Sequence, residues 1–287
     1  MNIMNKNEKI LIVGLGLIGG SYAKILFKKG YLVYGLSNKQ EDIDYAIHHH
    51  MIIDGQINVT KEFIGQFKYI IFALYPSIFI NWIKQYGSYI SLNTIISDVS
   101  GIKGNLVQTI QENLPKSIEF IGAHPMAGKE VYGIKNADEN LFKGANYIIT
   151  PNENNSQKGI DFATQIGELI EASHISVLSP SKHDEMIAFL SQLTHCIAIT
   201  LMTCKKSEHL KAYCGDSFRD LTRIANINEN MWCELFLNNK EELLSQMDLF
   251  LNEMNLLRQY IQNNNEVKIK EMMKISTQRR KHFNKEK

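Results

Sequence analysis

The chain has 287 residues, of which 44% are hydrophobic and 21% are charged, a composition typical of a globular protein with one or two domains. Its 31 Lys and Arg residues nearly balance its 30 Asp and Glu residues, so the net charge gives no support to nucleic-acid binding. The four cysteines form no closely spaced pairs, which excludes a disulfide scaffold and favours a reducing compartment. We find no secretory leader, and the longest apolar tract, residues 69–83, is interrupted by Pro76 and Asn81. We therefore expect a cytoplasmic protein that does not cross a membrane.

Residues 9–178 alternate short apolar runs with stretches of helical periodicity. The predicted strands are residues 9–13, 31–36, 69–74, 94–97, 120–122, 145–150 and 175–178. The predicted helices between them are residues 17–28, 40–47, 76–86, 103–113 and 159–170. Because strands alternate with helices and hairpin turns are lacking, we predict an α/β fold with a mostly parallel sheet covered on both faces.

The pattern changes after residue 179, where long helices follow one another without strands. Apolar residues recur every three or four positions through residues 183–206 and 240–262, and a third helix is predicted over residues 266–282. We predict a Rossmann-type dinucleotide-binding domain at residues 1–179 and a helical substrate and dimerisation domain at residues 180–287. Long helices with so many apolar residues commonly bury them against a second copy, so we expect a homodimer.

A glycine-rich motif separates the first predicted strand from the first predicted helix. Gly14 permits a tight turn, Gly16 lets the backbone approach a pyrophosphate, and Gly19 lets the helix pack closely on the strand. The predicted helix begins at Leu17, so Leu17 and Ile18 lie at the N-terminus that faces the phosphates. This arrangement predicts a site for NAD or NADP.

The end of the second predicted strand bears on the choice of cofactor. An NAD site usually has Asp or Glu there to bind the ribose hydroxyls, but this chain has Ser37, followed by Asn38 and Lys39. The Ser37 hydroxyl and Lys39 could accept a 2′-phosphate, which slightly favours NADP. Since no arginine is present, and Glu41 or Asp42 could reach back, the choice stays open.

His124 follows an apolar run at residues 120–121, where a strand is predicted to end. Ligands bind outside the carboxyl ends of the strands in open α/β sheets, and a histidine beside a nicotinamide can act as a base. A buried, hydrogen-bonded histidine is the alternative, but Pro125 and Gly128 favour a turn at the edge of the sheet. Nearby, Glu130 could tune the pKa of His124 or gate the pocket, or it could simply begin a helix.

Ser100 follows the fourth predicted strand and precedes a helix. Its hydroxyl could hydrogen-bond a catalytic imidazole or the amide of the cofactor, and it could equally cap the helix. Lys103, in the first turn of that helix, could be an ordinary surface residue.

The helical part contains two further candidates. His195 lies on an apolar helical face, where it is either a core histidine or a ligand-binding residue. Arg223 lies between apolar residues, and a buried guanidinium requires an anion, either Asp220 or a substrate carboxylate. The histidine triplet at residues 48–50 fits a frayed helix end better than a metal site, because consecutive side chains do not converge on one ion. We expect no metal.

Taken together, these motifs resemble the prephenate/arogenate dehydrogenase family over residues 8–232. The matching segments are residues 14–21 (GLGLIGGS), 122–128 (GAHPMAG), 141–145 (LFKGA), His195 and 220–225 (DLTRIA).

The resemblance implies a nucleotide-binding domain, a helical dimerisation domain, and oxidative decarboxylation of prephenate to 4-hydroxyphenylpyruvate in tyrosine biosynthesis. It implies that His124 accepts the proton of the ring 4-hydroxyl while hydride passes to the nicotinamide. It also makes His195 a substrate-binding histidine and Arg223 a carboxylate-binding arginine. The alternatives are an arogenate dehydrogenase and, more distantly, a non-catalytic dinucleotide sensor, which would not need these three residues together.

The chain departs from the family pattern at three positions. Gly101 stands where many members have serine, so the pairing of Ser100 with His124 is open. Gln192 and Thr194 stand where many members have histidine and proline, so one substrate contact is open too. The sequence does not decide between prephenate and arogenate, nor whether tyrosine inhibits.

Overall fold

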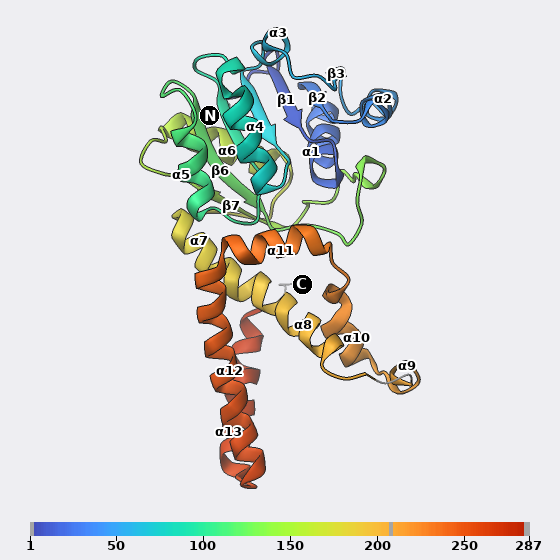
Figure 1. Cartoon of the computed structure of the whole chain (residues 1–287), viewed down its shortest axis with the longest axis vertical. Helices are drawn as coiled ribbons and strands as arrows, with labels where there is room; N and C mark the ends of the chain where they lie inside the picture. The colour runs from blue at the N-terminus through green and yellow to red at the C-terminus, as the bar shows by residue number, and fades with distance from the viewer. Residues whose placement is uncertain (1–2, 207–208, 284–287) are drawn as a thin grey trace. The chain divides into compact units, whose positions relative to one another are not determined.

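The computed structural model describes residues 3–206 and 209–283 (Figure 1). The chain forms two compact units, one ending at Asn239 and one beginning at Lys240. The first unit contains the whole sheet together with the helices up to α11. The predicted domain boundary at residue 180 therefore falls inside this unit and stays a prediction.

The first unit is built around an eight-stranded sheet with the order β3-β2-β1-β4-β5-β6-β7-β8. The strands are β1 (Lys9–Val13), β2 (Leu32–Leu36), β3 (Asp54–Gln56), β4 (Tyr69–Phe72), β5 (Ile95–Asp98), β6 (Glu119–Pro125), β7 (Asn146–Thr150) and β8 (His174–Val177). Neighbouring strands pair in parallel except β6 and β7, which are antiparallel. The predicted mostly parallel α/β sheet is confirmed.

Helices cover both faces of the sheet. Their bounds are α1 (Leu17–Lys28), α2 (Gln40–His48), α3 (Lys61–Ile64), α4 (Pro76–Tyr86), α5 (Gly104–Glu112) and α6 (Gln157–Leu169). Residues of α1, α2 and α6 belong to one hydrophobic cluster, and residues of α3, α4 and α5 belong to the other. Within β1, Ile10 and Ile12 belong to the first cluster and Leu11 and Val13 to the second, because successive side chains of a strand point to opposite faces. A strand buried on both faces is therefore apolar throughout.

The remaining helices follow the sheet. They are α7 (Pro180–Ile187), α8 (Leu193–Thr203), α9 (Leu210–Tyr213), α10 (Asp216–Thr222) and α11 (Glu229–Asn238) in the first unit, and α12 (Lys240–Gln262) and α13 (Glu266–Arg280) in the second. The predicted helix over residues 183–206 is observed as α7 and α8, joined by a π-helical turn at Ala188–Gln192. Such turns occur frequently at functional sites.

Within the described residues, one helical stretch, Pro180–Thr203, is long and apolar enough to cross a membrane, with a mean hydropathy of 1.6 and 28% of the tested window buried. Core helices of soluble proteins pass the same test, so this is weak evidence. The apolar tract at residues 69–83 forms β4 and most of α4.

The glycine-rich turn between β1 and α1 has the geometry that its sequence predicts. Gly14 has φ +93°, a conformation that favours glycine. A Cβ on Gly19 would lie 1.9 Å from the Gly14 carbonyl oxygen, so the helix could not pack this closely with any other residue. A Cβ on Gly16 would meet no atom within 4 Å. Gly16 therefore borders open space at the N-terminus of α1, which is where the predicted pyrophosphate would lie.

Two alanine substitutions separate packing from ligand binding in this turn. We expect Gly19→Ala to lower the free energy of unfolding by about 3 kcal/mol, since the backbone must move to admit the methyl group. Gly16→Ala should unfold like the wild type but bind dinucleotide more weakly, because its methyl group enters the ligand space. Thermal unfolding and dinucleotide titration measure the two effects. Equal destabilisation by both variants would contradict this account.

Candidate active site

His124 lies near the carboxyl end of β6 and is the first member of a hydrogen-bonded relay. Its Nδ1 lies 2.9 Å from Nε2 of His183 in α7, and His183 Nδ1 lies 2.7 Å from the Asp184 carboxylate. The His183 side chain is fully buried, whereas His124 remains partly exposed. The relay therefore runs from the protein interior to a ring that a ligand can reach.

The relay fixes the tautomer of both rings. A carboxylate only accepts hydrogen bonds, so His183 donates its Nδ1–H to Asp184 and, when neutral, presents an unprotonated Nε2. That nitrogen accepts from His124 Nδ1–H. Neutral His124 is thus left with a lone pair on Nε2, on the side of the ring away from the relay. This is the state that a general base requires.

Electrostatics keep this base unprotonated. Burial holds the pKa of His124 well below its usual range, and His183 and the Lys103 ammonium lower it further. Burial also lowers the pKa of His183, against the opposing effect of its hydrogen bond to Asp184. Both rings are therefore neutral at neutral pH.

Asp184 connects the relay to the nucleotide-binding sheet. Its two carboxylate oxygens accept hydrogen bonds from the backbone nitrogens of Lys103, at 2.8 Å, and Gly104, at 2.6 Å. These residues begin α5, so a carboxylate from a distant helix caps the N-terminus of α5 and is stabilised by its dipole. A Cβ on Gly104 would lie 2.8 Å from Asp184 Oδ2, which explains the glycine.

A buried ion pair lies beneath the relay. Lys103 Nζ donates to both Asp98 oxygens, at 2.7 and 2.6 Å, and neither side chain is exposed to solvent. Asp98 also accepts from the backbone nitrogens of Ser100 and Ala123, each at 3.0 Å. Since Ala123 directly precedes His124, the pair joins the ends of β5 and β6 and fixes the backbone that carries the base. The expectation that Lys103 is a surface residue was wrong.

Ser100 does not make the predicted hydrogen bond to His124. His124 Nδ1 is already occupied by His183, and the buried Ser100 Oγ has no hydrogen-bond partner in the described part of the chain. An unpaired buried hydroxyl is costly. It lies at the end of β5, near the base, so it is available to a polar group of a bound ligand.

His195 forms the second half of the candidate site. Its ring stacks on Trp232 of α11 with a centroid separation of 3.6 Å, and its Nδ1 donates to the Ser191 carbonyl at 2.8 Å. Neutral His195 therefore presents Nε2 as an acceptor. Burial lowers the pKa of His195, against the effect of the hydrogen bond to Ser191.

Arg223 differs from the sequence expectation. Its side chain is 68% exposed and pairs at 2.6 Å with Glu130, not with Asp220. Arg223 follows α10 in a 3₁₀ turn and reaches the loop after β6, which is why the apolar neighbours in the sequence gave a wrong impression of burial. Glu130 lies in that loop and does not begin a helix. The charges of Glu130 and Arg223 both act on His195.

Helix α11 runs between the sheet and α8 (Figure 1), and its residues contact both halves of the site. Its Glu234 accepts from the backbone nitrogen of Ser77, at the start of α4, at 2.6 Å. A Cβ on Gly101 would lie 3.7 Å from both His124 Nε2 and a methyl carbon of Leu235. Leu235 lies one helical turn after Trp232, the residue stacked on His195. The free edge of His124 and the ring of His195 are therefore near neighbouring turns of one helix.

Gln192 is one of the positions where the chain departs from the family pattern. Its side chain is buried; it donates to the Leu235 carbonyl at 3.0 Å and accepts from Asn239 at 2.9 Å. Gln192 thus holds α11 in place. Gly101, the other departure near the base, leaves the Nε2 edge of His124 without a covering side chain.

The residues at this edge of the sheet fit a nicotinamide dinucleotide. The strand register aligns Leu36, Val13, Phe72 and Asp98 across β2, β1, β4 and β5. Ser37, Gly14 and Ser100 therefore follow strand ends at one edge, in the order in which an extended dinucleotide would meet them. The open space at Gly16 suits the pyrophosphate and the unpaired Ser100 hydroxyl suits the carboxamide. Within the described residues, no group of His, Cys, Asp and Glu side chains is arranged to hold a metal ion.

Sequence reasoning missed three residues of this arrangement: His183, Asp184 and Trp232. The adjacent His183 and Asp184 appeared to be the polar start of an amphipathic helix, since an acid in the first turn is common there. Nothing local indicates that they reach β6 and α5. Trp232 lay beside a recognised motif, but its stacking on His195 depends on the packing of α11 against α8.

Two protein-family models, one for each of two domains, together match most of the chain. Residues 22–176 match the prephenate dehydrogenase nucleotide-binding domain, and residues 179–275 match the prephenate dehydrogenase dimerization domain. The chain belongs to the prephenate dehydrogenase family.

Individual relatives agree with this membership. Prephenate dehydrogenase of Bacillus subtilis (strain 168) is 29% identical over 265 residues, which cover 89% of this chain and 70% of that protein. Cyclohexadienyl dehydrogenase of Zymomonas mobilis is 27% identical over 260 residues, covering 88% and 87%. The structure of prephenate dehydrogenase from A. aeolicus, in complex with hydroxyphenyl propionate and NAD+, has 28% identity and a TM-score of 0.88, covering 96% of this chain and 98% of that one.

Membership of the prephenate dehydrogenase family identifies the chain as an oxidoreductase with a Rossmann-type nucleotide-binding fold. Tyrosine biosynthesis follows from the family. A nicotinamide dinucleotide as the cofactor is consistent with the matched nucleotide-binding domain and with the NAD+ complex of the relative. The exact substrate and the choice between NAD and NADP are finer questions.

The buried ion pair can be tested by unfolding. Lys103→Met leaves the Asp98 carboxylate buried without its cation, so we expect a loss of about 3–5 kcal/mol in the free energy of unfolding. The double variant Asp98→Asn/Lys103→Met removes the stranded charge and should recover part of that loss. Urea titrations of the wild type and both variants measure the difference. A double variant that is no more stable than Lys103→Met would contradict the ion-pair account.

Proposed function

We propose that this chain oxidises and decarboxylates prephenate to 4-hydroxyphenylpyruvate, with His124 as the general base. The hydrogen-bonded relay from Asp184 through His183 to His124 carries this proposal, because it leaves an unprotonated Nε2 at the edge of the predicted nucleotide site. A dinucleotide sensor would bind its ligand through the glycine turn and would have no need of such a base.

His124 would accept the proton of the ring 4-hydroxyl at Nε2. When bound, the nicotinamide accepts hydride from the carbon that carries this hydroxyl. Cleavage of the bond to the ring carboxylate then releases CO₂, and its electron pair moves into the ring to give an aromatic phenolate. His124 would return its proton to the phenolate oxygen, which gives 4-hydroxyphenylpyruvate. Aromatisation supplies the driving force, so the protein mainly has to position the ring and remove one proton. On accepting this proton His124 becomes an imidazolium, since the proton of Nδ1 stays on its hydrogen bond to His183.

Arg223 would bind a carboxylate at the other end of prephenate, and the ring of His195, stacked on Trp232, would lie beside it. Arg223 is exposed and paired with Glu130, so a substrate carboxylate would have to share or replace Glu130 as its partner. An exposed ion pair of this kind contributes little to stability, which makes the exchange inexpensive. Ser100 Oγ, which has no other partner in the described residues, would bind the carboxamide of the cofactor.

One observation favours arogenate as a second candidate substrate. Neutral His195 presents Nε2 as an acceptor, since its Nδ1–H is donated to Ser191. An ammonium group of arogenate could donate to this nitrogen directly, whereas a keto acid offers no such donor. A relative named cyclohexadienyl dehydrogenase is consistent with activity toward more than one such substrate.

The proposed assembly is a homodimer formed through the helical part. The match to a dimerization domain over residues 179–275 supports it, as do the exposed apolar side chains of Phe189, Leu190 and Met202 in the apolar stretch Pro180–Thr203. A second copy covering these side chains would remove them from water. A cytoplasmic location stays a prediction.

A steady-state assay tests the proposed reaction. Reduced dinucleotide formation is followed at 340 nm with prephenate and with arogenate, each with NAD+ and with NADP+. We expect turnover with prephenate that exceeds turnover with arogenate. Greater kcat/KM for arogenate would instead select the second candidate, and no turnover with either would reject both.

His124→Asn tests the base. We expect kcat to fall about 10²–10⁴-fold while dinucleotide binding and thermal unfolding stay unchanged. His174→Asn, the same change at an exposed histidine of β8, is the matched control and should leave kcat unaltered. A near-normal kcat for His124→Asn would exclude His124 as the base.

The pH profile of the wild type provides a further check on the base. Activity requires neutral His124, so kcat/KM should fall as pH drops through its pKa. Because burial, His183 and Lys103 all lower that pKa, the acid limb should lie below the ordinary histidine value of about 6.5. An acid limb well above that value would contradict the assigned environment.

Arg223→Ala should mainly raise KM for prephenate, with a smaller effect on kcat, because the guanidinium would bind a carboxylate and not the reacting atoms. Arg219→Ala is a suitable control, since Arg219 is also exposed and paired, in this case with Asp216. An unchanged KM in Arg223→Ala would mean that Arg223 serves only its ion pair with Glu130.

A further inference from the structure

We infer that Asp42 supplies the ribose-binding carboxylate that position 37 lacks, and that this enzyme therefore prefers NAD to NADP. The inference rests on the proposed function only in that a dinucleotide binds at the glycine turn. It does not depend on which substrate is oxidised. It runs against the slight preference for NADP that the sequence suggested.

The geometry at the end of β2 carries the inference. Ser37 follows β2 directly, is only 7% exposed, and donates its hydroxyl hydrogen to Asp42 Oδ2 at 2.9 Å. The carboxylate thus lies one hydrogen bond beyond the side chain that ends the strand. A longer acidic side chain at position 37 would direct its own carboxylate into the same region.

The same hydrogen bond weakens the case for a 2′-phosphate. The NADP interpretation uses the Ser37 hydroxyl and the Lys39 side chain to bind a 2′-phosphate. The hydroxyl hydrogen is already given to Asp42, which leaves Lys39 as the remaining donor of the two. The Ser37 oxygen also accepts from the backbone nitrogen of Lys39 at 3.4 Å. A phosphate placed against Ser37 would therefore meet a carboxylate at close range.

Asp42 is suitably placed to bind hydroxyl groups. It lies in the first turn of α2, where the helix dipole stabilises a negative charge. It is only partly exposed, and within the described residues its second oxygen, Oδ1, accepts no hydrogen bond. Two vicinal ribose hydroxyls could donate to this carboxylate as they do to the acid that usually ends the second strand.

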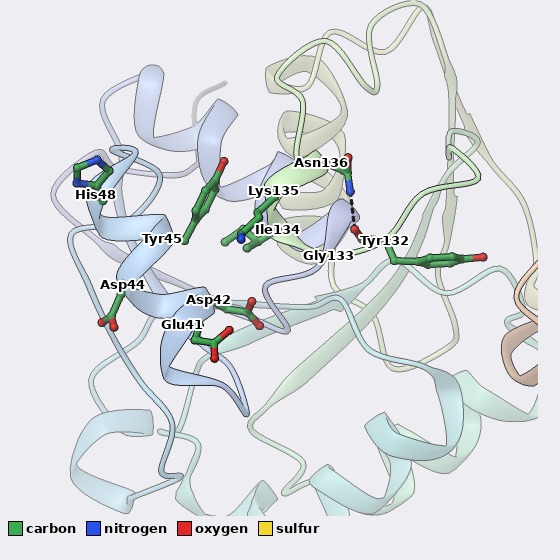
Figure 2. A pocket seen from close by; sticks show the side chains of 10 residues that line it. All are labelled: Glu41, Asp42, Asp44, Tyr45, His48, Tyr132, Gly133, Ile134, Lys135 and Asn136. Carbon is green, nitrogen blue, oxygen red and sulfur yellow. Dashed lines mark hydrogen bonds between the residues drawn. The ribbon is translucent and has the colours of Figure 1, made fainter.

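The surroundings of Asp42 are acidic as well. A cavity of about 780 Å³ lies between α2 and the segment Tyr132–Asn136, and Figure 2 shows the side chains that line it. Glu41, Asp42 and Asp44 line it from α2, and Lys135 is the lysine that faces them from the loop. A 2′-phosphate carries about two negative charges and would be repelled by this set, whereas a neutral ribose would not.

Binding constants, measured without substrate, test the inference. Isothermal titration of NAD+ and NADP+ is applied to the wild type, Asp42→Asn and the matched control Glu62→Gln, which removes the same charge from the first turn of another helix, α3. We expect the wild type to bind NAD+ at least about tenfold more tightly than NADP+, as the loss of a charge-assisted hydrogen bond would predict. Asp42→Asn should weaken NAD+ binding about tenfold or more and bring the two constants together. Glu62→Gln should change their ratio by less than about threefold.

A rescue variant separates ribose recognition from a general effect on α2. Ser37→Asp in the Asp42→Asn background returns a carboxylate to the usual position and should restore the preference for NAD+. Equal binding of NAD+ and NADP+ by the wild type, or an unchanged ratio in Asp42→Asn with intact thermal unfolding, would overturn the inference. A clear preference for NAD+ together with no turnover of prephenate or arogenate would instead count against the proposed function alone.

Discussion

The buried contact between Asp98 and Lys103 is the constraint on which the candidate site depends. Two charges without solvent access are costly unless they are paired and fully hydrogen-bonded, and here Asp98 also binds the backbone nitrogens of Ser100 and Ala123. The pair therefore holds the ends of β5 and β6 in one arrangement, and with them the backbone of His124. The Lys103 ammonium also lowers the pKa of His124 and so helps to keep that ring neutral.

Asp184 connects the histidine relay to the same region. Its carboxylate caps α5, beginning at the backbone of Lys103, while it orients His183. One side chain thus joins the helix after β8 to the sheet and sets the tautomer of the base. Helix α11 completes the arrangement, since Glu234 binds the start of α4 and Trp232 stacks on His195. A shift of α7 or of α11 would therefore alter the surroundings of both His124 and His195.

Sequence reasoning predicted the regular elements well where the periodicity was long and apolar. The observed bounds of β1, α1 and α12 agree with the predicted ranges, because local patterning is enough to define them. It missed β3 and α3, which are short and lack an apolar run, and it also missed α9, α10 and α11. It also gave a strand end at residue 122, whereas β6 continues to Pro125 because it pairs with β7. Two of the alternatives considered from the sequence were wrong, the pairing of Ser100 with His124 and that of Arg223 with Asp220, because His183 and Glu130, which are distant in the chain, are the observed partners of His124 and Arg223.

The sequence by itself determined the fold class, the glycine turn, the family and the position of His124 near a strand end. Each of these follows from the spacing of residues that are close in the sequence, because such residues form one strand, one turn or one helix. Only the tertiary structure decided that His183 and Asp184 hold the base, that Lys103 is buried, that Arg223 pairs with Glu130, and that Asp42 reaches Ser37. Most of these contacts join residues far apart in the chain, and even the five-residue step from Ser37 to Asp42 depends on how a strand and a helix meet. Hydrogen bonds and ion pairs of this kind leave no periodic trace in the sequence.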